Sequence, residues 1–404
     1  MSNLPKGWEE VLVENVFDNI GGTSLEKFVN ENGKYKFISI GNYSKSGKYI
    51  DNSQRIDINE KSANKILNKN DLVMVLNDKT STGDIIGSSI LIEESDKYIY
   101  NQRSERLICK NNIYPKFAWQ LLNSKYFRKK IVSLSQGGTQ IYINFPVIKK
   151  INFYLPPLEE QKKIADILST VDKKIAFVEE NINVTEELKK GLMQKLLTEG
   201  IGHTEFKDSE LGRIPQGWEL KTLGELVFIL TDYTANGSFA SLKENVTYFN
   251  EPNFAALVRT TDLKKKEFKP ERFTDKRGYE FLKKSALYGG EILMANVGSI
   301  GEVYIVPEVD FPMTLAPNMY LIKYNDNLIN TYAYYFMNSS IFINQLLSKI
   351  ASTTLQAVNK ANFKSIKIPL PPLEEQKKIA DILSTVDKKI AFVEENINAT
   401  EELK

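Results

Sequence analysis

Apolar residues recur at alternating steps of four and three along residues 158–197, a stretch with no proline and no glycine before Gly191. Such steps form a heptad pattern, which places one narrow apolar seam along a helix. The register passes through two polar positions to Leu192 and Leu196, and charged residues occupy the other faces. The pattern predicts one long helix whose seam begins with Ile164, Leu168, Val171, Ile175, Val178 and Ile182.

The same pattern occurs twice. Residues 155–189 and 370–404 match at 34 of 35 positions, with Val184 against Ala399 as the only difference. An offset of 215 residues is too long for a solenoid and indicates two domain-sized halves that end in the same element. Two matching seams can bury each other, so we expect an antiparallel helix pair, although each helix could instead pack on its own domain. The second seam consists of Ile379, Leu383, Val386, Ile390, Val393 and Ile397.

The segments before the two helices, residues 1–154 (the first module) and 214–369 (the second module), differ in sequence but share a skeleton. Each has Pro-x-Gly-Trp-Glu near its start, then an apolar strand with a glycine-flanked turn, an aromatic-rich helical stretch and a polar loop before Pro-Pro. Strand-like runs mixed with one or two helices predict an α+β fold for each module. These runs are Tyr35–Ile40, Leu72–Leu76, Ile85–Ile92, Leu107–Cys109, Ala256–Arg259, Ile292–Ala295, Gly301–Val306 and Met319–Ile322. The aromatic residues expected in the cores are Trp119, Tyr126, Phe127, Tyr332, Tyr334, Tyr335 and Phe336.

Composition excludes several classes of function. No apolar run approaches the roughly 20 residues of a membrane helix, and the single cysteine, Cys109, fits a reducing cytoplasm. The only histidine, His203, argues against histidine-based catalysis and multi-histidine metal sites, so we expect no metal and no catalytic residue. No phosphate-binding loop motif is present. The net charge of +2 means that any nucleic-acid surface must be a local patch.

With the repeat, the Gly-Trp-Glu openings, "LPPLEEQKKIADIL" at 155–168 and 370–383, and "ELGRIPQGWEL" at 210–220, the chain resembles the specificity subunit of type I restriction–modification enzymes along essentially its whole length. The resemblance implies an α+β fold with two globular target-recognition domains, separated by two long antiparallel helices in a coiled coil with a pseudo-two-fold, circular repeat. It implies four parts: target-recognition domains at 1–154 and 214–369, a central helical region with its connector at 155–213, and a distal helical region at 370–404.

The resemblance also implies partners. Each target-recognition domain would recognise half of a bipartite site in double-stranded DNA. The helices would bind two methyltransferase (M) subunits, which carry S-adenosylmethionine and methylate adenine, and restriction (R) subunits would join through that complex. No cofactor is expected in this chain. Residues 190–213 have no counterpart after Lys404, so we expect 190–200 to lack a helix partner, and to be either loose or covered by the methyltransferase.

DNA contacts require basic side chains for phosphates and amide, hydroxyl or guanidinium groups for base edges. In the first module the candidates lie in four polar loops: Lys45, Lys48, Lys79, Thr80, Ser81, Gln102, Arg103, Thr139, Gln140 and Tyr142. In the second module they lie in a basic stretch and in the loops after it: Arg259, Lys264, Lys265, Lys276, Arg277, Asn296, Thr354, Gln356, Asn359 and Lys360.

Three alternatives remain open from the sequence. The chain could be a stand-alone DNA-binding regulator with two modules. It could be a nuclease, since "KEFK" at 266–269 contains a Glu-x-Lys triplet, although such triplets are common by chance. It could also belong to a fused restriction–methylation system outside type I, a distinction that lies in its partners.

Overall fold

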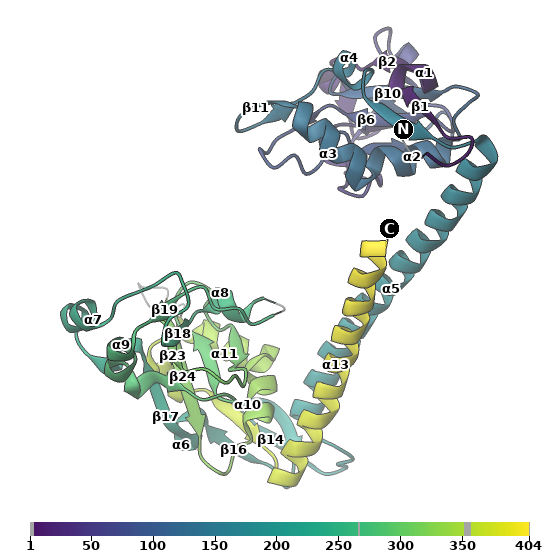
Figure 1. The fold of residues 1–404 in the computed structure, drawn as a ribbon. Helices are drawn as coiled ribbons and strands as arrows, with labels where there is room; N and C mark the ends of the chain where they lie inside the picture. The colour runs from purple at the N-terminus through teal and green to yellow at the C-terminus, as the bar shows by residue number, and fades with distance from the viewer. Residues whose placement is uncertain (1–3, 266, 351–356, 404) are drawn as a thin grey trace. The chain divides into compact units, whose positions relative to one another are not determined.

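The computed structural model describes residues 4–265, 267–350 and 357–403. These residues form two compact units, one comprising the described residues up to 176 together with Leu403, and one comprising those from 177 to 402. The 41-residue helix α5, Leu158–Thr198, is continuous across the boundary (Figure 1). In the described part of the chain, none of the helices has the length and apolarity that crossing a membrane requires. The predicted four-part division, which follows role rather than compactness, stays a prediction.

The first unit contains two four-stranded sheets, one in the order β2-β10-β6-β8 and one in the order β3-β5-β4-β9, besides smaller sheets β1-β13 and β11-β12-β7. Its strands are β1 Glu9–Leu12, β2 Phe17–Gly21, β3 Val29–Asn30, β4 Tyr35–Ile38, β5 Arg55–Ile56, β6 Leu72–Val75, β7 Asn77–Asp78, β8 Ser89–Leu91, β9 Tyr98–Tyr100, β10 Ser104–Cys109, β11 Gln136–Gly137, β12 Ile141–Tyr142 and β13 Asn152–Leu155. Its helices before α5 are α1 Val13–Val16, α2 Pro115–Asn123, α3 Lys125–Leu134 and α4 Phe145–Ile148.

The second unit repeats the central sheet as β17-β24-β21-β22 and the junction pair as β16-β25. Its second sheet, β19-β18-β23-β20, has its fourth strand at the opposite edge, and β14-β15 forms a separate pair. Its strands are β14 Phe206–Ser209, β15 Gly212–Pro215, β16 Glu219–Thr222, β17 Val227–Asp232, β18 Ala255–Val258, β19 Phe273–Thr274, β20 Ala286–Leu287, β21 Ile292–Ala295, β22 Val303–Ile305, β23 Met313–Leu315, β24 Met319–Tyr324 and β25 Lys367–Leu370. Its helices after α5 are α6 Leu223–Leu226, α7 Phe239–Asn245, α8 Thr260–Leu263, α9 Lys276–Phe281, α10 Asn330–Met337, α11 Ser340–Ile350, α12 Lys360–Lys364 and α13 Leu373–Leu403.

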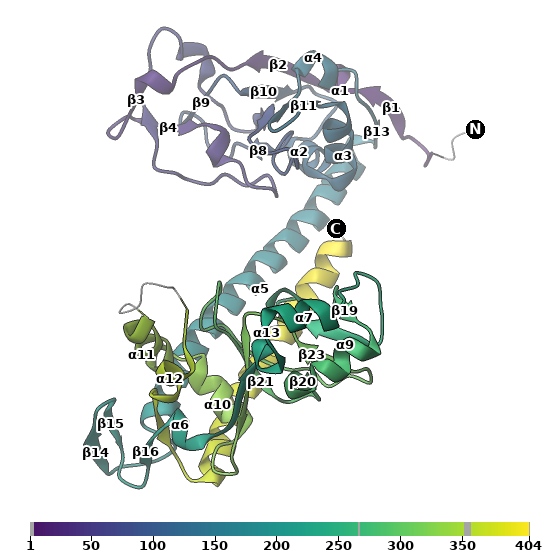
Figure 2. The same ribbon diagram turned by 90° about the vertical axis from the view of Figure 1, so that its left-hand side faces the viewer.

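The central strand of each unit, β6 in the first and β21 in the second, is buried along its whole length, and Figure 2 shows β21 among the strands and helices of the second unit. In β6, Leu72 and Met74 pack with residues of α2 and α3, whereas Val73 and Val75 pack with the second sheet. Alternate side chains of a strand point to opposite faces, so an uninterrupted apolar run fits a strand covered on both sides. Strand β21 follows the same rule in the second unit, where Ile292 and Met294 face α10 and α11. The α+β prediction is confirmed for both modules.

Six of the eight predicted strands agree with the observed strands to within two residues at each end, and a seventh, β10, begins three residues earlier than predicted. The run Ile85–Ile92 was predicted too long, because β8 begins only at Ser89 and the residues before it form a loop. Phe127, Tyr332, Tyr335 and Phe336 are buried as expected. Tyr126, in contrast, is 49% exposed on α3 and is not a core residue.

The repeated motifs meet at one junction in each unit. In the first, the indole Nε1 of Trp8 donates to Glu160 at 3.1 Å, and in the second Trp218 donates to Glu375 at 2.9 Å. A fully buried glutamine follows each of these glutamates in the sequence. Its side chain hydrogen-bonds the backbone of the loop before a module helix and the carbonyl of the proline before the long helix. These residues are Gln161 and Gln376. The Gly-Trp-Glu and Leu-Pro-Pro-Leu-Glu-Glu-Gln motifs therefore join each module to its helix.

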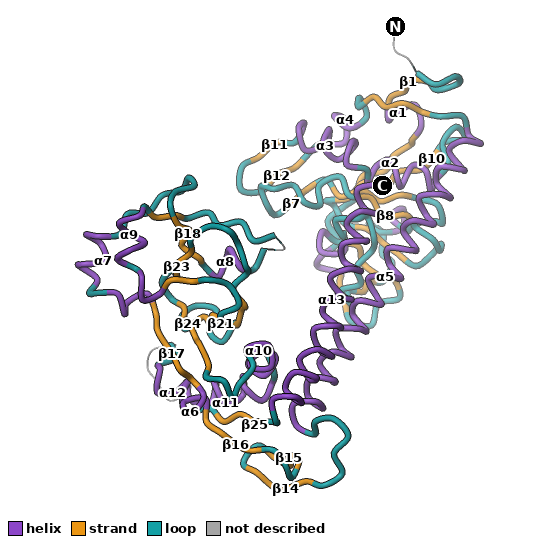
Figure 3. Tube along the Cα trace, turned by 60° about the horizontal axis from the view of Figure 1, so that its bottom comes forward, coloured by secondary structure: helices purple, strands orange, loops and turns teal. Residues whose placement is uncertain are grey.

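Within the second unit, the end of α5 runs antiparallel to α13 (Figure 3). Lys189 forms an ion pair with Asp387 at 2.5 Å. Leu196 and Leu197 share a buried cluster with Ile379 and Leu383. The prediction that residues 190–200 lack a helix partner is wrong, because antiparallel packing brings them against the start of α13 rather than its end. Every predicted seam residue of both helices is buried or half-buried, while the pairing of the two seams along their whole length stays a prediction.

Candidate nucleic-acid interface

Two of the predicted DNA-contacting loops of the first module lie side by side. Strand β7, which begins the loop with Lys79, Thr80 and Ser81, pairs with β12, and β12 pairs with β11 across the loop with Thr139 and Gln140. All five of these side chains are exposed. The hydroxyl of Tyr142, a 41% exposed residue on β12, donates to Gln136 at 3.3 Å.

The other two predicted loops reach the same end of the sheet. Lys45 forms an ion pair with Asp84 at 2.7 Å, and the guanidinium of Arg128 donates to the carbonyls of both residues, at 3.5 and 2.9 Å. The backbone N–H of Leu76, just before β7, donates to the carbonyl of Arg103 at 2.9 Å. The structure therefore brings all four predicted segments of the first module to one end of its central sheet.

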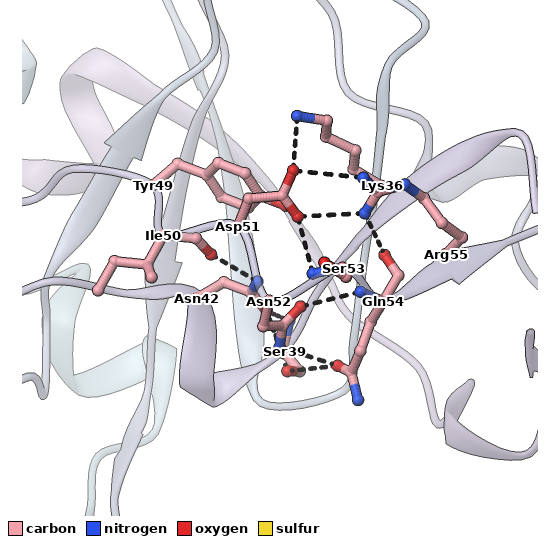
Figure 4. Close-up of polar contacts among 10 residues, drawn as sticks. All are labelled: Lys36, Ser39, Asn42, Tyr49, Ile50, Asp51, Asn52, Ser53, Gln54 and Arg55. Atoms are coloured by element: carbon pink, nitrogen blue, oxygen red, sulfur yellow. Dashed lines mark hydrogen bonds and ion pairs between the residues drawn. The ribbon is translucent and has the colours of Figure 1, made fainter. Parts of the chain in front are cut away.

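A polar network shapes the loop that carries Lys45 and Lys48 (Figure 4). The buried Asn42 accepts from the backbone N–H of Ser39 and donates to the carbonyl of Ile50, so it closes the loop at its base. Beside it, Asp51 forms ion pairs with Lys36 at 2.8 Å and with Arg55 at 3.1 Å. Hydrogen bonds from these two cations lower the pKa of Asp51. Lys36 and Arg55 thus share the single carboxylate of Asp51, while Lys45 and Lys48 are exposed.

Asp78 holds the neighbouring loop. Its carboxylate, in a residue only 4% exposed, accepts from the backbone N–H groups of Ile85 at 2.7 Å and Thr80 at 2.9 Å, and from the Thr80 hydroxyl at 2.8 Å. Burial raises the pKa of Asp78, but these hydrogen bonds outweigh burial and lower the pKa overall. The carboxylate is therefore a positioning group for Lys79 and Ser81.

Replacing Asp78 with asparagine is expected to destabilise the first unit by about 1–3 kcal/mol, because charge-assisted hydrogen bonds are lost. A carboxyl with a lowered folded-state pKa stabilises fully above the unfolded pKa, about 3.9 for aspartate, and loses this effect as pH falls through the folded pKa. The difference between Asp78→Asn and the unchanged chain should therefore be largest near neutral pH and shrink below about pH 4.

Urea unfolding at neutral and acid pH checks this. Asp84→Asn is the matched control, because the exposed pair of Asp84 with Lys45 is worth at most about 1 kcal/mol. Equal losses for the two variants would contradict the loop-holding role of Asp78.

In the second module, several predicted DNA-contacting cations are already paired with carboxylates. Arg259 contacts Asp262 at 2.7 Å and Glu271 at 3.0 Å. Lys265 also pairs with Glu271, and Lys264 pairs with Glu302 at 2.8 Å. Lys276 and Arg277 are exposed at the start of α9, and Arg277 donates to the Asn245 side chain at 2.9 Å. The net positive patch is therefore smaller than the sequence suggests.

The remaining candidates of the second module lie around the ends of β21 and α12. Lys360 forms an ion pair with Asp232 at 2.7 Å. The Asn359 side chain accepts from the N–H of Asn362 at 2.7 Å and so caps α12. The carbonyl of Asn296 accepts from the N–H of Val358 at 3.2 Å, which places these segments together. Thr354 and Gln356 lie outside the described residues.

Sequence reasoning missed the residues that hold these loops, namely Asn42, Asp78 and Arg128. The only available sequence signal concerned Asp78: the pair Asn77-Asp78 directly follows an apolar strand, which is typical of a turn. Arg106, three residues after the candidate Arg103, does not belong to this exposed set, because it forms a buried ion pair with Asp71 at 2.8 Å.

Comparison with known proteins fits this architecture. A family profile described as type I restriction modification DNA specificity domain matches residues 5–187 and 215–402. The type I restriction enzyme MjaVIII specificity subunit of Methanocaldococcus jannaschii is 29% identical over 404 residues, covering 96% of this chain and 88% of the relative. The putative type I restriction enzyme MjaX specificity subunit of the same organism is 31% identical over 327 residues, covering 76% of this chain and 72% of the relative.

Solved structures show the same fold. The S subunit of a type I restriction–modification system from M. genitalium aligns with a TM-score of 0.56 and 16% identity, covering 100% of this chain and 95% of the other. A chain from a structural study of complex assembly and conformational transition in the type I system aligns with a TM-score of 0.58 and 18% identity, covering 100% and 97%. The chain belongs to the family of type I restriction–modification DNA specificity subunits.

Proposed function

We propose that the chain recognises a bipartite DNA site, with one half-site bound by each module, and that its repeated helices dock two methyltransferase subunits. The observation that carries this proposal is the contrast between a repeated scaffold and different loops. Both modules have the same strand order in the central sheet and the same tryptophan–glutamate junction. The polar loops at the corresponding sheet ends carry different side chains.

The chemistry of these loops supports DNA recognition without catalysis. The exposed Lys45, Lys48, Lys79 and Arg103 suit phosphates, and Thr139 and Gln140 on the adjacent loop suit base edges. The reaction would be carried out by the methyltransferase with its S-adenosylmethionine and, through that complex, by the restriction subunit. This chain would supply sequence choice and geometry.

Two equivalent aromatic residues support two docking faces. Phe177 on α5 is 64% exposed, and Phe392, its counterpart 215 residues later on α13, is 65% exposed. Both lie off the seam that joins the helices. Exposed large aromatic side chains on a helix face are typical of interaction surfaces.

Phe177→Asp and Phe392→Asp are each expected to reduce the bound methyltransferase from two copies to one, and the double variant to none, because a carboxylate at a desolvated contact is unfavourable. Native mass spectrometry of the complex measures this. Asn183→Asp is the control, since it adds the same charge at another exposed position of α5. Two bound copies in the double variant would place docking elsewhere.

The proposed function is tested by co-expressing the chain with a methyltransferase subunit in an unmethylated host and mapping modified adenine. Two short sequence blocks around a fixed gap are expected. Tight site-specific binding by the chain alone, without methylation, would instead favour a stand-alone regulator. DNA cleavage by the purified chain with magnesium would favour a nuclease.

A further inference from the structure

The second module contains a cavity of about 560 Å³ at the end of its central sheet. It lies between α7, the segment 232–234 at the end of β17, the residue after β21 and the residues just before β24. Ligand sites of this size are usually lined by apolar and aromatic groups with a few polar atoms. Here the aromatic residues are Tyr233, Phe239 and Tyr248, and the polar ones include Lys243 and Asn296.

Asn296 lines this cavity and carries an unused hydrogen-bonding atom. Its Oδ1 is shielded from solvent and has no hydrogen-bond partner among the residues that the structure describes, and rotation of the side chain would bring it to a ligand. A buried polar atom without a partner is unfavourable, and such atoms in native structures often mark a binding role. A carboxamide can both accept and donate, so it pairs with the N6 and N7 edge of adenine.

The first module shows that the fold does not need an amide at this position. Its Leu76 occupies the corresponding place, because the N–H of Leu76 donates to Arg103 and its carbonyl accepts from Ile143, both at 2.9 Å. Asn296 makes the same two backbone contacts, with Asn318 at 3.1 Å and Val358 at 3.2 Å. A leucine is therefore compatible with this backbone, and the asparagine is a property of the second module alone.

The rest of the cavity offers stacking surfaces and positive charge. Phe239 is 83% exposed and Tyr248 is 46% exposed, so both present ring surface to solvent. The Tyr248 hydroxyl is hydrogen-bonded to that of Tyr233 at 2.8 Å. Lys243 lines the cavity, and the guanidinium of Arg272 lies 5.8 Å from the centre of the Tyr248 ring. Aromatic rings beside cations bind the bases and phosphates of unpaired nucleotides.

We propose that this cavity binds one adenine nucleotide, with the base against the aromatic rings and the Asn296 carboxamide, and the phosphate near Lys243 and Arg272. The nucleotide could come from an unpaired position in DNA or from solution, and the recognising chemistry is the same. Only the DNA source rests on the proposed function. No covalent step is involved.

The test uses the full chain and calorimetric titration with deoxyadenosine monophosphate and with purine deoxyriboside monophosphate, which lacks the 6-amino group. Asn296→Leu should weaken binding of the adenine nucleotide about tenfold and binding of the purine nucleotide by a smaller factor, because purine keeps N7 but lacks the 6-amino group. Phe239→Ala should weaken both about tenfold. Phe228→Ala, which removes another exposed phenylalanine that does not line the cavity, should change neither.

A second arm compares a duplex that has one unpaired adenosine with the fully paired duplex, so that it separates the DNA source from the free nucleotide. If the chain prefers the duplex with the unpaired adenosine, and Asn296→Leu abolishes this preference, the DNA source is supported. If the chain binds the nucleotide but shows no such preference, the free ligand is supported. Failure to bind either ligand overturns the proposal. If Asn296→Leu changes only the methylation of fully paired DNA and neither binding measurement, the proposal is also overturned, because Asn296 would then contact a base in the groove.

Thermal unfolding separates binding from a structural role. Asn296→Leu should unfold at the same or a higher temperature, because it removes an unpaired buried polar atom. A fall of several degrees would make the amide structural and overturn the proposal. The nucleotide titration needs no DNA target, so its result is independent of whether the chain directs methylation.

Discussion

Inserting one heptad after Glu180 of α5, together with one heptad after Glu395 of α13, is expected to lengthen the gap between the two half-sites by about 3 base pairs. Seven helical residues add about 10 Å, and base pairs are about 3.4 Å apart. A heptad keeps the seam on the same side of each helix. Keeping the register in which Lys189 faces Asp387 places Glu180 opposite Asn396, so the inserted residues would pair with each other.

Mapping methylated adenine for this variant measures the effect. Both half-sites should be unchanged, and methylation at the original spacing should be lost. A heptad in α5 alone is the control, and it should abolish methylation at every spacing because the paired seams no longer match. A changed half-site sequence with an unchanged gap would contradict the role of the helices in setting the spacing.

Replacing Leu383 with aspartate is expected to destabilise the second unit by more than about 4 kcal/mol, because it removes buried apolar contacts and buries an unpaired charge. Leu383 is fully buried in a cluster that includes Met193 and Leu196 of α5 and Ile379 of α13. The first unit has its own core, so a separate unfolding transition should persist.

Ile382→Asp is the matched control, since the neighbouring Ile382 is 38% exposed on the same helix. It should change the free energy of unfolding by about 1 kcal/mol or less. Thermal unfolding followed by circular dichroism compares the two. Similar losses for both variants would show that the seam does not carry the stability of this helix pair.

The periodic and repeated features were predictable because they follow from local rules. The heptad spacing from Ile164 to Ile182 determines which helix face is buried, and four apolar residues in a row, as in Leu72–Val75, fit a strand covered on both sides. The repeated Trp-Glu and Leu-Pro-Pro motifs also indicated two equivalent halves. The contacts between the two motifs, Trp8 with Glu160 and Trp218 with Glu375, depend on tertiary structure.

The properties of the loops were less predictable. Arg259, Lys264 and Lys265 form a basic stretch in sequence, but Asp262 and Glu271 within the stretch, and Glu302 far along the chain, balance part of their charge. The run from Ile85 looked like strand because it is apolar, yet the Asp78 carboxylate holds its first residue in a loop. Long-range pairings of this kind leave no periodic signal in the sequence.

The most direct test of the account replaces residues 219–369 with residues 9–154, so that both positions carry the first module. The exchange keeps the junctions, because Glu219 pairs with Leu370 in β16-β25 as Glu9 pairs with Leu155 in β1-β13. Methylated adenine is then mapped for the chimera with its methyltransferase. The account predicts an inverted repeat of the first half-site around the original gap. Methylation at the original asymmetric site would contradict it, as would loss of all methylation in a chimera that folds and binds the methyltransferase.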